Sequence, residues 1–469
     1  MPVKLSSHAR LKTALVLRDA LSADLGLPLP TAMRQLATVE DMLGARAAFE
    51  EGGYLLALAS LCHPTGERLT ALHHELRAAC LKAHLAPRYA QYLALLLFAH
   101  WLDARFSAPT ALLARLNERL AAHPPSGVVF EPFTETDLQF AAFWMATASG
   151  KTHILHATLA LLESRQHWDR ILLITPSEAL TRQHAEQLRG LRQWPVFAYP
   201  LDGDASTLGH LPPDTVIVLD INKLAAEKKG DGVTIPTEVF QDGRNLVFVD
   251  EGHKGQRAEA SVWKKLQRDL AGIGSPDPRC RGLLIEFSAT FGQVAEAEHT
   301  FDRYAKSVLF DYAYDRFHAD RYGKDFWHLR LDGGGPVGPV VQRHTLTAAL
   351  VAFWHQLTAF RSAAGQRHSA EAGLHIAEPL WVLLGLSVIG GSARSDLEQT
   401  SDVVEVLRFL DAILRQPADW AAWLGEGLAV PAGGTDLLPP EVRTALCGQA
   451  AEPLAGRILA EVFGWRAGD

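Results

Sequence analysis

Leucine and alanine recur every three or four residues from about Ser6 to His123, as in "RLTALHHELRAACLKAHL" and "APTALLARLNERLAAH". This spacing puts the apolar side chains on one side of a helix and predicts an all-helical N-terminal domain over residues 1–124. The stretch "HPPSG", which ends at Gly127, interrupts the pattern because consecutive prolines cannot continue a helix. We therefore expect a domain boundary there.

Beyond this boundary, short apolar runs alternate with helical stretches. The runs are "RILLITP", "DTVIVLD", "NLVFVDEGH" and "GLLIEFSAT". Uninterrupted apolar runs are typical of parallel strands that are covered on both faces, and alternation with helices indicates crossover connections. The sequence thus predicts an α/β domain with a parallel sheet over residues 128–302.

After residue 302 the pattern changes twice. Mixed aromatic and charged residues, followed by "GGGPVGP", predict a connector over residues 303–375 that includes a helix from about Thr345 to Ser362. The apolar run "PLWVLLGLSVIG" then predicts a strand over residues 379–390, which would begin a second α/β unit over residues 376–469. A unit of about 90 residues is small for a domain, so we expect it to be partial.

Composition sets the context in which these domains work. The 469 residues are 48% hydrophobic and 21% charged, as in globular proteins. The formal charge of −8 argues against a basic nucleic-acid-binding coat but leaves room for a local basic channel. Four scattered cysteines suit a reducing compartment, and the longest apolar run, "YLALLLFAHWL", is shorter than the roughly 20 residues of a membrane span. We therefore expect a cytoplasmic protein without a membrane partner.

The segment "MATASGKT" carries groups that suit a nucleotide phosphate. A phosphate-binding loop needs backbone N–H groups, a lysine for the outer phosphates and a hydroxyl for magnesium at the start of a helix. The residues that would hold ATP and Mg²⁺ are consecutive: Thr147, Ala148, Ser149, Gly150, Lys151 and Thr152. Met145 stands where the full pattern has its first glycine, so this motif alone does not exclude a chance match.

A pair of carboxylates supports the nucleotide interpretation. Four apolar residues, Leu246 to Val249, run directly into Asp250 and Glu251, which places both at the carboxyl end of a buried strand. Ligands of open parallel sheets bind at that edge, where a phosphate loop also lies. Asp250 would then hold magnesium, and Glu251 would orient and deprotonate the attacking water. The alternative is a solvated acidic turn.

Four segments together resemble a known family. "MATASGKT", "LLITPSEALTRQHAEQL", "VDEGHKG" and "EFSATFGQ" are similar to motifs I, Ia, II and III of superfamily 2 helicases of the DEAD/DEAH type, in their usual order. "FWMATASGKT", "DEGHKG" and "SATFGQ" resemble more narrowly the helicase (Res) subunit of type III restriction enzymes and its defence-associated relatives. The likeness covers residues 133–390 and leaves out the N-terminal helices.

The resemblance implies a fold and a set of roles. Residues 128–302 would form a RecA-like domain with Lys151, Asp250 and Glu251 in catalysis, and residues 376–469 would begin a second RecA-like domain. His253 would couple the nucleotide to motif III, which contains Ser288 and Thr290. Residues that would contact the backbone of DNA, expected to be double-stranded, are Thr175, Pro176, Arg182, Gln183, Asn222 and Lys223. For "TPSEAL" the alternative is a strand end with a serine helix cap.

Two departures from the family affect the expected activity. Ala148 stands where many members have glycine, and its methyl group narrows the freedom of the loop, which we expect to be tolerated. Motifs V and VI, whose arginines stabilise the γ-phosphate, are not found before Asp469, so we expect a fragment or one half of a split enzyme with slow ATP hydrolysis. No nuclease constellation is evident. A second motor half, a nuclease or a methyltransferase is therefore an expected partner.

Three functions remain open at this point. The first is an ATP-dependent DNA helicase or translocase module, and it is favoured by the intact Lys151, Asp250 and Glu251. The second is an ATP-binding scaffold or recruitment module with little ATPase activity, favoured by the missing motifs. The third, a phosphate-loop enzyme for a small molecule, is disfavoured by the "SAT" and "TP" segments.

Overall fold

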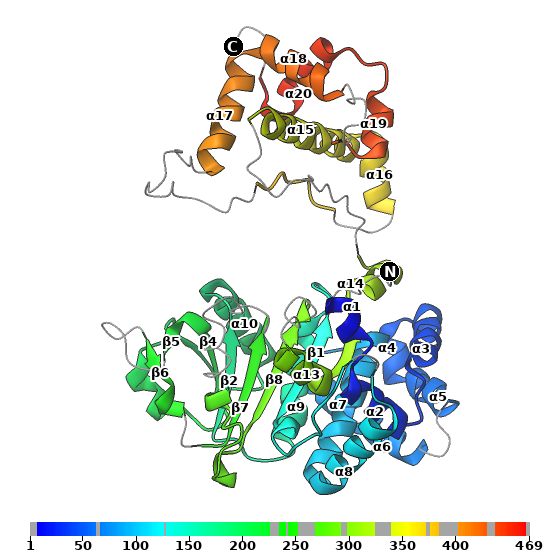
Figure 1. The fold of residues 1–469 in the computed structure, drawn as a ribbon, viewed down its shortest axis with the longest axis vertical. Helices are drawn as coiled ribbons and strands as arrows, with labels where there is room; N and C mark the ends of the chain where they lie inside the picture. Colours follow the sequence, from blue (N-terminus) through cyan, green and yellow to red (C-terminus); the bar gives the residue numbers. More distant parts are fainter. Residues whose placement is uncertain are drawn as a thin grey trace. The chain divides into compact units, whose positions relative to one another are not determined.

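The structure is a computed structural model that describes most of the chain. The described residues are 7–61, 66–125, 128–225, 234–240, 243–251, 268–291, 298–323, 339–371, 376–383, 402–428 and 437–465. They fall into two compact units, Met1–Lys324 and Asp325–Asp469, which are described separately (Figure 1).

The first unit is built on a seven-stranded sheet in which all pairings are parallel, as the sequence predicts. The spatial order is β3-β4-β2-β7-β8-β1-β9. The strands are β1 (Phe140–Met145), β2 (Arg170–Thr175), β3 (Val196–Tyr199), β4 (Val216–Asp220), β7 (Asn245–Asp250), β8 (Leu283–Ser288) and β9 (Val308–Tyr312). A separate pair of short strands consists of β5 (Leu224–Ala225) and β6 (Ile235–Pro236).

Successive residues of each strand enter different cores. Leu173 and Phe248 face the cluster that contains the N-terminal helices, whereas their neighbours Leu172 and Val247 face a second cluster on the other side of the sheet. This follows from the two-residue period of a strand, and it explains why both faces need apolar residues. The crossover helices are α9 (Lys151–Glu163), α10 (Glu178–Leu191) and α13 (Glu298–Ser307).

The N-terminal region is helical, as predicted, but the structure does not separate it as a domain. Its helices are α1 (Ser7–Lys12), α2 (Val16–Asp24), α3 (Leu29–Leu43), α4 (Ala45–Glu50), α5 (Gly53–Ala59), α6 (Gly66–Lys82), α7 (Tyr89–Ser107) and α8 (Pro109–Ala122). They gather at the end of the sheet formed by β1 and β9 (Figure 1). Their apolar residues and those of the sheet form one hydrophobic cluster, and one compact unit contains both.

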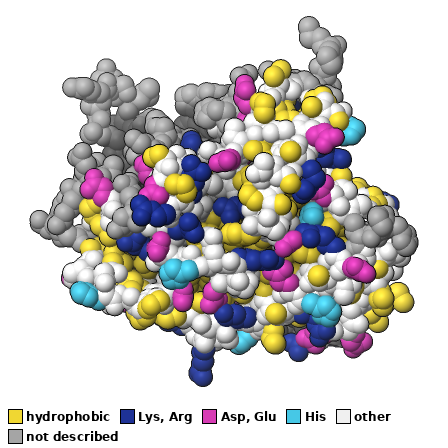
Figure 2. All heavy atoms as spheres, turned by 90° about the horizontal axis from the view of Figure 1, so that it is seen from below, with side chains coloured by type: hydrophobic (Ala, Val, Ile, Leu, Met, Phe, Trp, Pro, Cys, Tyr) yellow, Lys and Arg dark blue, Asp and Glu magenta, His cyan; other side chains and the backbone are white. Residues whose placement is uncertain are grey.

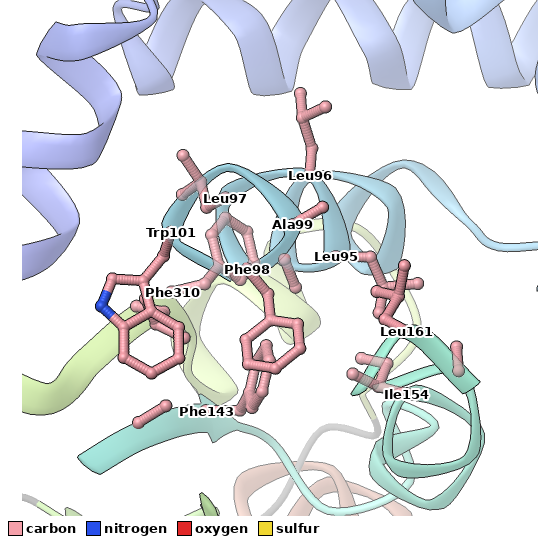
Figure 3. Packing of buried hydrophobic residues seen from close by; sticks show 14 of the residues in the cluster. Leu95, Leu96, Leu97, Phe98, Ala99, Trp101, Phe143, Ile154, Leu161 and Phe310 are labelled. Carbon is pink, nitrogen blue, oxygen red and sulfur yellow. The ribbon is translucent and has the colours of Figure 1, made fainter. Parts of the chain in front are cut away.

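Helix α7 is the centre of this shared core. Nearly all of its 19 residues are buried. Figure 3 shows Phe98 and Trp101 pointing toward Phe143 of β1 and Phe310 of β9, while Leu96 points to the opposite side. A helix that is apolar on every side needs cover on every side, and here the sheet supplies one side and the other N-terminal helices supply the rest.

The expected connector begins later than residue 303. Residues Val308–Tyr312 form β9, which pairs with β1 at the edge of the sheet. Helix α14 (Tyr314–Ala319) follows, and both belong to the first unit. The sheet therefore extends beyond the predicted boundary at residue 302, because β9 completes it beside β1. The buried Asp311 of β9 also accepts from Arg18 Nη1 of α2 at 2.5 Å.

The described residues of the second unit form helices, not the expected second RecA-like domain. These helices are α15 (Pro339–Arg361), α16 (Ala363–Glu371), α17 (Asp402–Arg415), α18 (Pro417–Leu428), α19 (Pro440–Leu446) and α20 (Ala451–Phe463). Their apolar faces enclose one core around Trp354 and Trp420. The strand expected over residues 379–390 is not formed by residues 379–383, where Trp381 stacks on Phe353 of α15 instead, and residues 384–390 lie outside the described chain.

The described surface has two further properties. Seen from below, basic and acidic side chains are interspersed with hydrophobic ones on the described part of this face (Figure 2). Among the described residues, no helix combines the length and the apolar character that crossing a membrane requires.

Candidate nucleotide-binding site

The loop between β1 and α9 has the backbone of an anion-binding turn. Ala148 and Gly150 have φ angles of 67° and 86°, whereas Ser149 between them does not have a positive φ. The Ser149 N–H and hydroxyl both donate to the Ala146 carbonyl, at 3.2 and 2.7 Å. Alternating left-handed residues direct successive N–H groups to one concave side, which suits an anion at the start of a helix.

Gly150 is required at its position for two reasons. Its left-handed backbone is strained for a residue with a side chain, and an added Cβ would lie 2.2 Å from Nε2 of Gln91 on α7. The Gln91 amide occupies this space because its Nε2 donates to the Ser149 carbonyl at 3.0 Å. Ala148, by contrast, is exposed, so its methyl group is accommodated at the cost of backbone strain.

The two motifs that suggest a nucleotide meet in space. Lys151 Nζ lies 3.3 Å from Glu251 Oε1, with side chains that are 10% and 18% exposed. The Glu251 N–H donates to Asp250 Oδ1 at 3.0 Å, and Glu251 has a φ of 53° that turns the chain at the end of β7. Lys151 begins α9 after β1 and the carboxylates lie at the end of β7, and β8 separates these two strands in the sheet.

A histidine that sequence reasoning missed holds Asp250. His184 Nε2 lies 3.0 Å from Asp250 Oδ2, and the His184 side chain is 3% exposed. A signal for it exists in the sequence, because His184 shares the apolar face of α10 with Thr181 and Leu188 at helical spacing. An imidazole on such a face requires a polar partner, and here that partner is Asp250.

A second buried histidine lies close by on α9. Burial, with smaller contributions from the charges of His184 and His153, lowers the pKa of His156 to about 3. Its Nε2 has no hydrogen-bond partner among the described residues. His156 therefore stays neutral at physiological pH.

Motif III lies between the two nucleotide motifs on β8. Ser288 is buried, and its Oγ accepts from the Thr290 N–H at 3.1 Å. The Thr290 hydroxyl is buried without a hydrogen-bond partner among the described residues. Phe287 pairs with Asp250 across the sheet, so Ser288 follows directly after the level of the carboxylates. His253, the expected partner of this motif, lies outside the described residues.

The residues expected at nucleic acid fall into two groups. The Thr175 side chain is buried and its Oγ1 lies 2.6 Å from Thr181 Oγ1, so its hydroxyl is hydrogen-bonded within the fold. Ser177 caps α10 by accepting from the Leu180 N–H, which is the alternative considered for "TPSEAL". Arg182 and Gln183 lie on the exposed face of the helix, where Arg182, 60% exposed, pairs weakly with Glu178 at 3.8 Å.

The turn after β4 carries the other expected contact residues. Asp220 Oδ1 accepts from both the backbone and the side-chain nitrogen of Asn222, each at 2.8 Å. Asn222 is exposed and Lys223 is half-buried, and both follow β4 at the carboxyl edge of the sheet. Asn222 thus shapes the turn and at the same time lies on the surface. Pro176 lies at the same edge, directly after β2.

The donor set fits a nucleotide phosphate with a divalent cation. The turn of N–H groups, the Lys151 ammonium, the Thr152 hydroxyl at the start of α9 and the Asp250 carboxylate are the groups that such a ligand needs. Among the described residues, no group of three or more histidine, cysteine or carboxylate side chains is arranged to hold a metal ion.

Part of the chain that contains this site matches a known protein family. Residues 108–293 match the model of the family described as "Type III restriction enzyme, res subunit". This region resembles a superfamily 2 helicase. The match is less than half of the chain, and it contains β1 through β8 with the loop and both carboxylates. Residues 108–293 of the first unit are therefore similar to a helicase domain of this family, and helices α1 to α7 lie outside the matched residues.

Two solved structures are similar to the chain at low identity. The structure titled T4 UvsW is 14% identical, with a TM-score of 0.27, over 48% of this chain and 42% of that chain. T. fusca Cas3 with ATP is 15% identical, with a TM-score of 0.23, over 65% of this chain and 41% of that chain. The chain thus spans less than half the length of these proteins. No curated protein matches its sequence.

Proposed function

We propose that the first unit is an ATP-dependent motor that moves along DNA, a helicase or translocase of the res-subunit class that uses Mg²⁺. The observation that carries the proposal is the meeting of Lys151 with Glu251 at the carboxyl edge of the sheet, beside the turn at Gly150. An acidic turn exposed to solvent would not require a 3.3 Å contact with a lysine at the start of α9. The contact therefore favours a nucleotide site over the solvated turn.

The residues of the site would act in sequence. When ATP binds, the ion pair between Lys151 and Glu251 would break and Lys151 would bind the outer phosphates instead, because they carry more negative charge than one carboxylate. Asp250, oriented by His184, and Thr152 would hold Mg²⁺, which would supply positive charge to the transferred phosphoryl group. Glu251, released from Lys151, orients the attacking water and accepts its proton.

Contact with DNA would use exposed and half-buried residues at the same edge. Arg182 and Gln183 on α10, with Asn222 and Lys223 after β4, are suited to phosphate oxygens because they are charged or amide donors. Thr175 would position this edge from inside, and Pro176 would shape its turn. In motif III, Ser288 and Thr290 would transmit the state of the nucleotide together with His253.

A second function is supported by a different observation. The described part of the second unit is a helical bundle around Trp354 and Trp420, a shape that suits recruitment of a partner such as a second motor half, a nuclease or a methyltransferase. In that case the first unit would bind ATP and change its partner affinity with little turnover.

ATP turnover with and without double-stranded DNA separates these functions. The wild type is compared with Glu251→Gln and Lys151→Ala, and magnesium-dependent ATP binding is measured in parallel. DNA-stimulated turnover that disappears in Glu251→Gln supports the motor. Binding that requires Lys151 without turnover supports the scaffold. If the wild type binds no ATP, the nucleotide proposal is wrong.

A further inference from the structure

The N-terminal helices reach the phosphate loop through one buried side chain. Gln91 on α7 donates from Nε2 to the Ser149 carbonyl at 3.0 Å, and both residues are buried. The family match begins at residue 108, so Gln91 lies outside the matched residues whereas Ser149 lies within them.

The orientation of the Gln91 amide is fixed at both of its ends. Oε1 accepts from the Arg88 N–H at 2.9 Å, in a capping box at the start of α7. The amide group therefore has its oxygen toward an N–H and its nitrogen toward a carbonyl, and an amide flip would break both bonds. Gln91 can donate to Ser149 only while α7 begins where it does.

The start of α7 is held in turn by a buried carboxylate. Glu40 on α3 accepts from the Tyr89 N–H at 2.6 Å, from the Tyr54 hydroxyl at 2.7 Å and from Arg88 Nη1 at 3.0 Å. A carboxylate at a helix N-terminus satisfies N–H groups and favours the helix dipole. The Gln91 side chain thus extends from a rigid point of the N-terminal region.

The hydrogen bond from Gln91 to the Ser149 carbonyl determines the direction in which the backbone N–H groups of the loop point. In a trans peptide the C=O and the following N–H point in opposite directions, so a Ser149 carbonyl held toward α7 turns the Gly150 N–H away from it. A Ser149 carbonyl that turned into the concave side of the loop would repel a phosphate. We propose that Gln91 is a positioning residue for the nucleotide, which makes the N-terminal helices part of the nucleotide site.

The inference rests on the proposed nucleotide function, and two substitutions at one position test it. Gln91→Glu keeps an acceptor for the Arg88 N–H but removes the donor to Ser149, whereas Gln91→Met removes both. The matched control is Asn117→Ala on α8. Asn117 makes the same kind of contact, bonding the N–H and C=O of Phe133 at 2.6 and 3.0 Å, in the segment before β1.

Four quantities are measured on the full chain: the Kd for a fluorescent ATP analogue with magnesium, KM and kcat for ATP, amide exchange over residues 146–152, and the melting temperature. Loss of a buried donor costs about 1–3 kcal/mol, so both Gln91 variants should raise Kd and KM roughly tenfold with a smaller change in kcat. Exchange of the loop should rise in both. Asn117→Ala should lower the melting temperature and leave Kd and loop exchange unchanged.

Two results would overturn the inference. One is a Gln91→Glu protein with wild-type Kd and wild-type loop exchange, and the other is an Asn117→Ala protein whose loop changes as much as in the Gln91 variants. If the wild type does not bind nucleotide, the proposed function is wrong. Loop exchange then still decides whether Gln91 positions the loop, because that measurement requires no ligand.

Discussion

At the scale of single residues, Glu251 and a nucleotide phosphate would compete for Lys151. While the ion pair exists, the lysine is neutralised by its own protein, and a nucleotide phosphate must displace the carboxylate. The pair is only partly exposed, so the competition is less screened than on an open surface.

Glu251→Gln should therefore strengthen ATP binding while it removes turnover. The variant frees Lys151 from a competing charge, which we expect to lower the Kd several-fold, in line with about 1 kcal/mol for a partly exposed pair. Hydrolysis should fall at least a hundredfold because the base is lost. Calorimetric titration and steady-state turnover on one preparation check both. Weaker binding by the variant would contradict this account of the pair.

Gly150→Ala should be far more damaging than an ordinary glycine substitution. The added Cβ would lie 2.2 Å from Gln91 Nε2, and the left-handed backbone at this position is strained for alanine. We therefore expect the variant to lose at least about 2 kcal/mol of stability and most nucleotide binding. Gly190→Ala in α10 is the control, because its Cβ would meet nothing within 4 Å and alanine favours a helix. Urea unfolding of both variants measures the contrast.

His184 gives a third prediction, which concerns the metal. Removal of the imidazole in His184→Ala leaves Asp250 without its 3.0 Å partner, and we expect the magnesium concentration for half-maximal nucleotide binding to rise about tenfold or more. His153→Ala, an exposed change on α9, is the control and should keep the wild-type magnesium dependence. Equal magnesium curves for wild type and His184→Ala would show that Asp250 needs no orientation.

At the scale of elements, the packing of α9 against α6 and the sheet makes stability depend on pH. His156 of α9 is buried among apolar residues, and its pKa is lowered to about 3 from 6.5. Because the folded pKa is below the unfolded value, the unfolded chain takes up the proton first. The stability due to the neutral ring is present above about pH 6.5 and is lost as the pH falls toward 3.

We expect His156 to reduce the free energy of unfolding by about 2 kcal/mol between pH 7 and pH 5. His156→Leu, which fills a similar volume without a titrating group, should flatten this part of the stability curve. His153→Asn should retain the wild-type slope, since His153 is exposed on the same helix. Urea unfolding at several pH values gives the slopes, and parallel curves for wild type and His156→Leu would refute the assignment.

At the scale of the whole molecule, the central fact is that one core serves the N-terminal helices and the motor fold. Helix α7 is buried on all sides, and Phe98 packs toward Phe143 of β1 (Figure 3). Removing the helices would expose this face of the sheet to water at about 25 cal/mol per Å² of apolar surface.

A fragment of residues 128–323 should therefore fail to fold, whereas residues 1–324 should fold as one unit. The longer fragment should show a single cooperative thermal transition and resist limited proteolysis near residue 125. The shorter one should aggregate or bind a hydrophobic dye. A soluble, cooperatively folding fragment of residues 128–323 would mean that the shared core is dispensable.

The sequence by itself determined the parts of this protein that depend on local order. Buried parallel strands need unbroken apolar runs, and a phosphate loop needs glycine, lysine and a hydroxyl in adjacent positions, so "SGKT", "VFVDE" and the helical N-terminal region could be recognised along the chain. The prediction that these motifs form a nucleotide site depends on the same local rules, together with the edge at which parallel strands end.

Only the tertiary structure decided what depends on contacts between distant residues. Gln91 and Ser149 are 58 positions apart and His184 and Asp250 are 66 apart, so no local pattern could pair them. The boundary at residue 302 failed for the same reason, because β9 is recognisable as a strand only beside β1. Thr175 was expected at DNA because its motif suggested it, but its hydroxyl meets Thr181 once α10 packs on the sheet. Side-chain partners across a fold are set by packing, and packing is not encoded in any single segment.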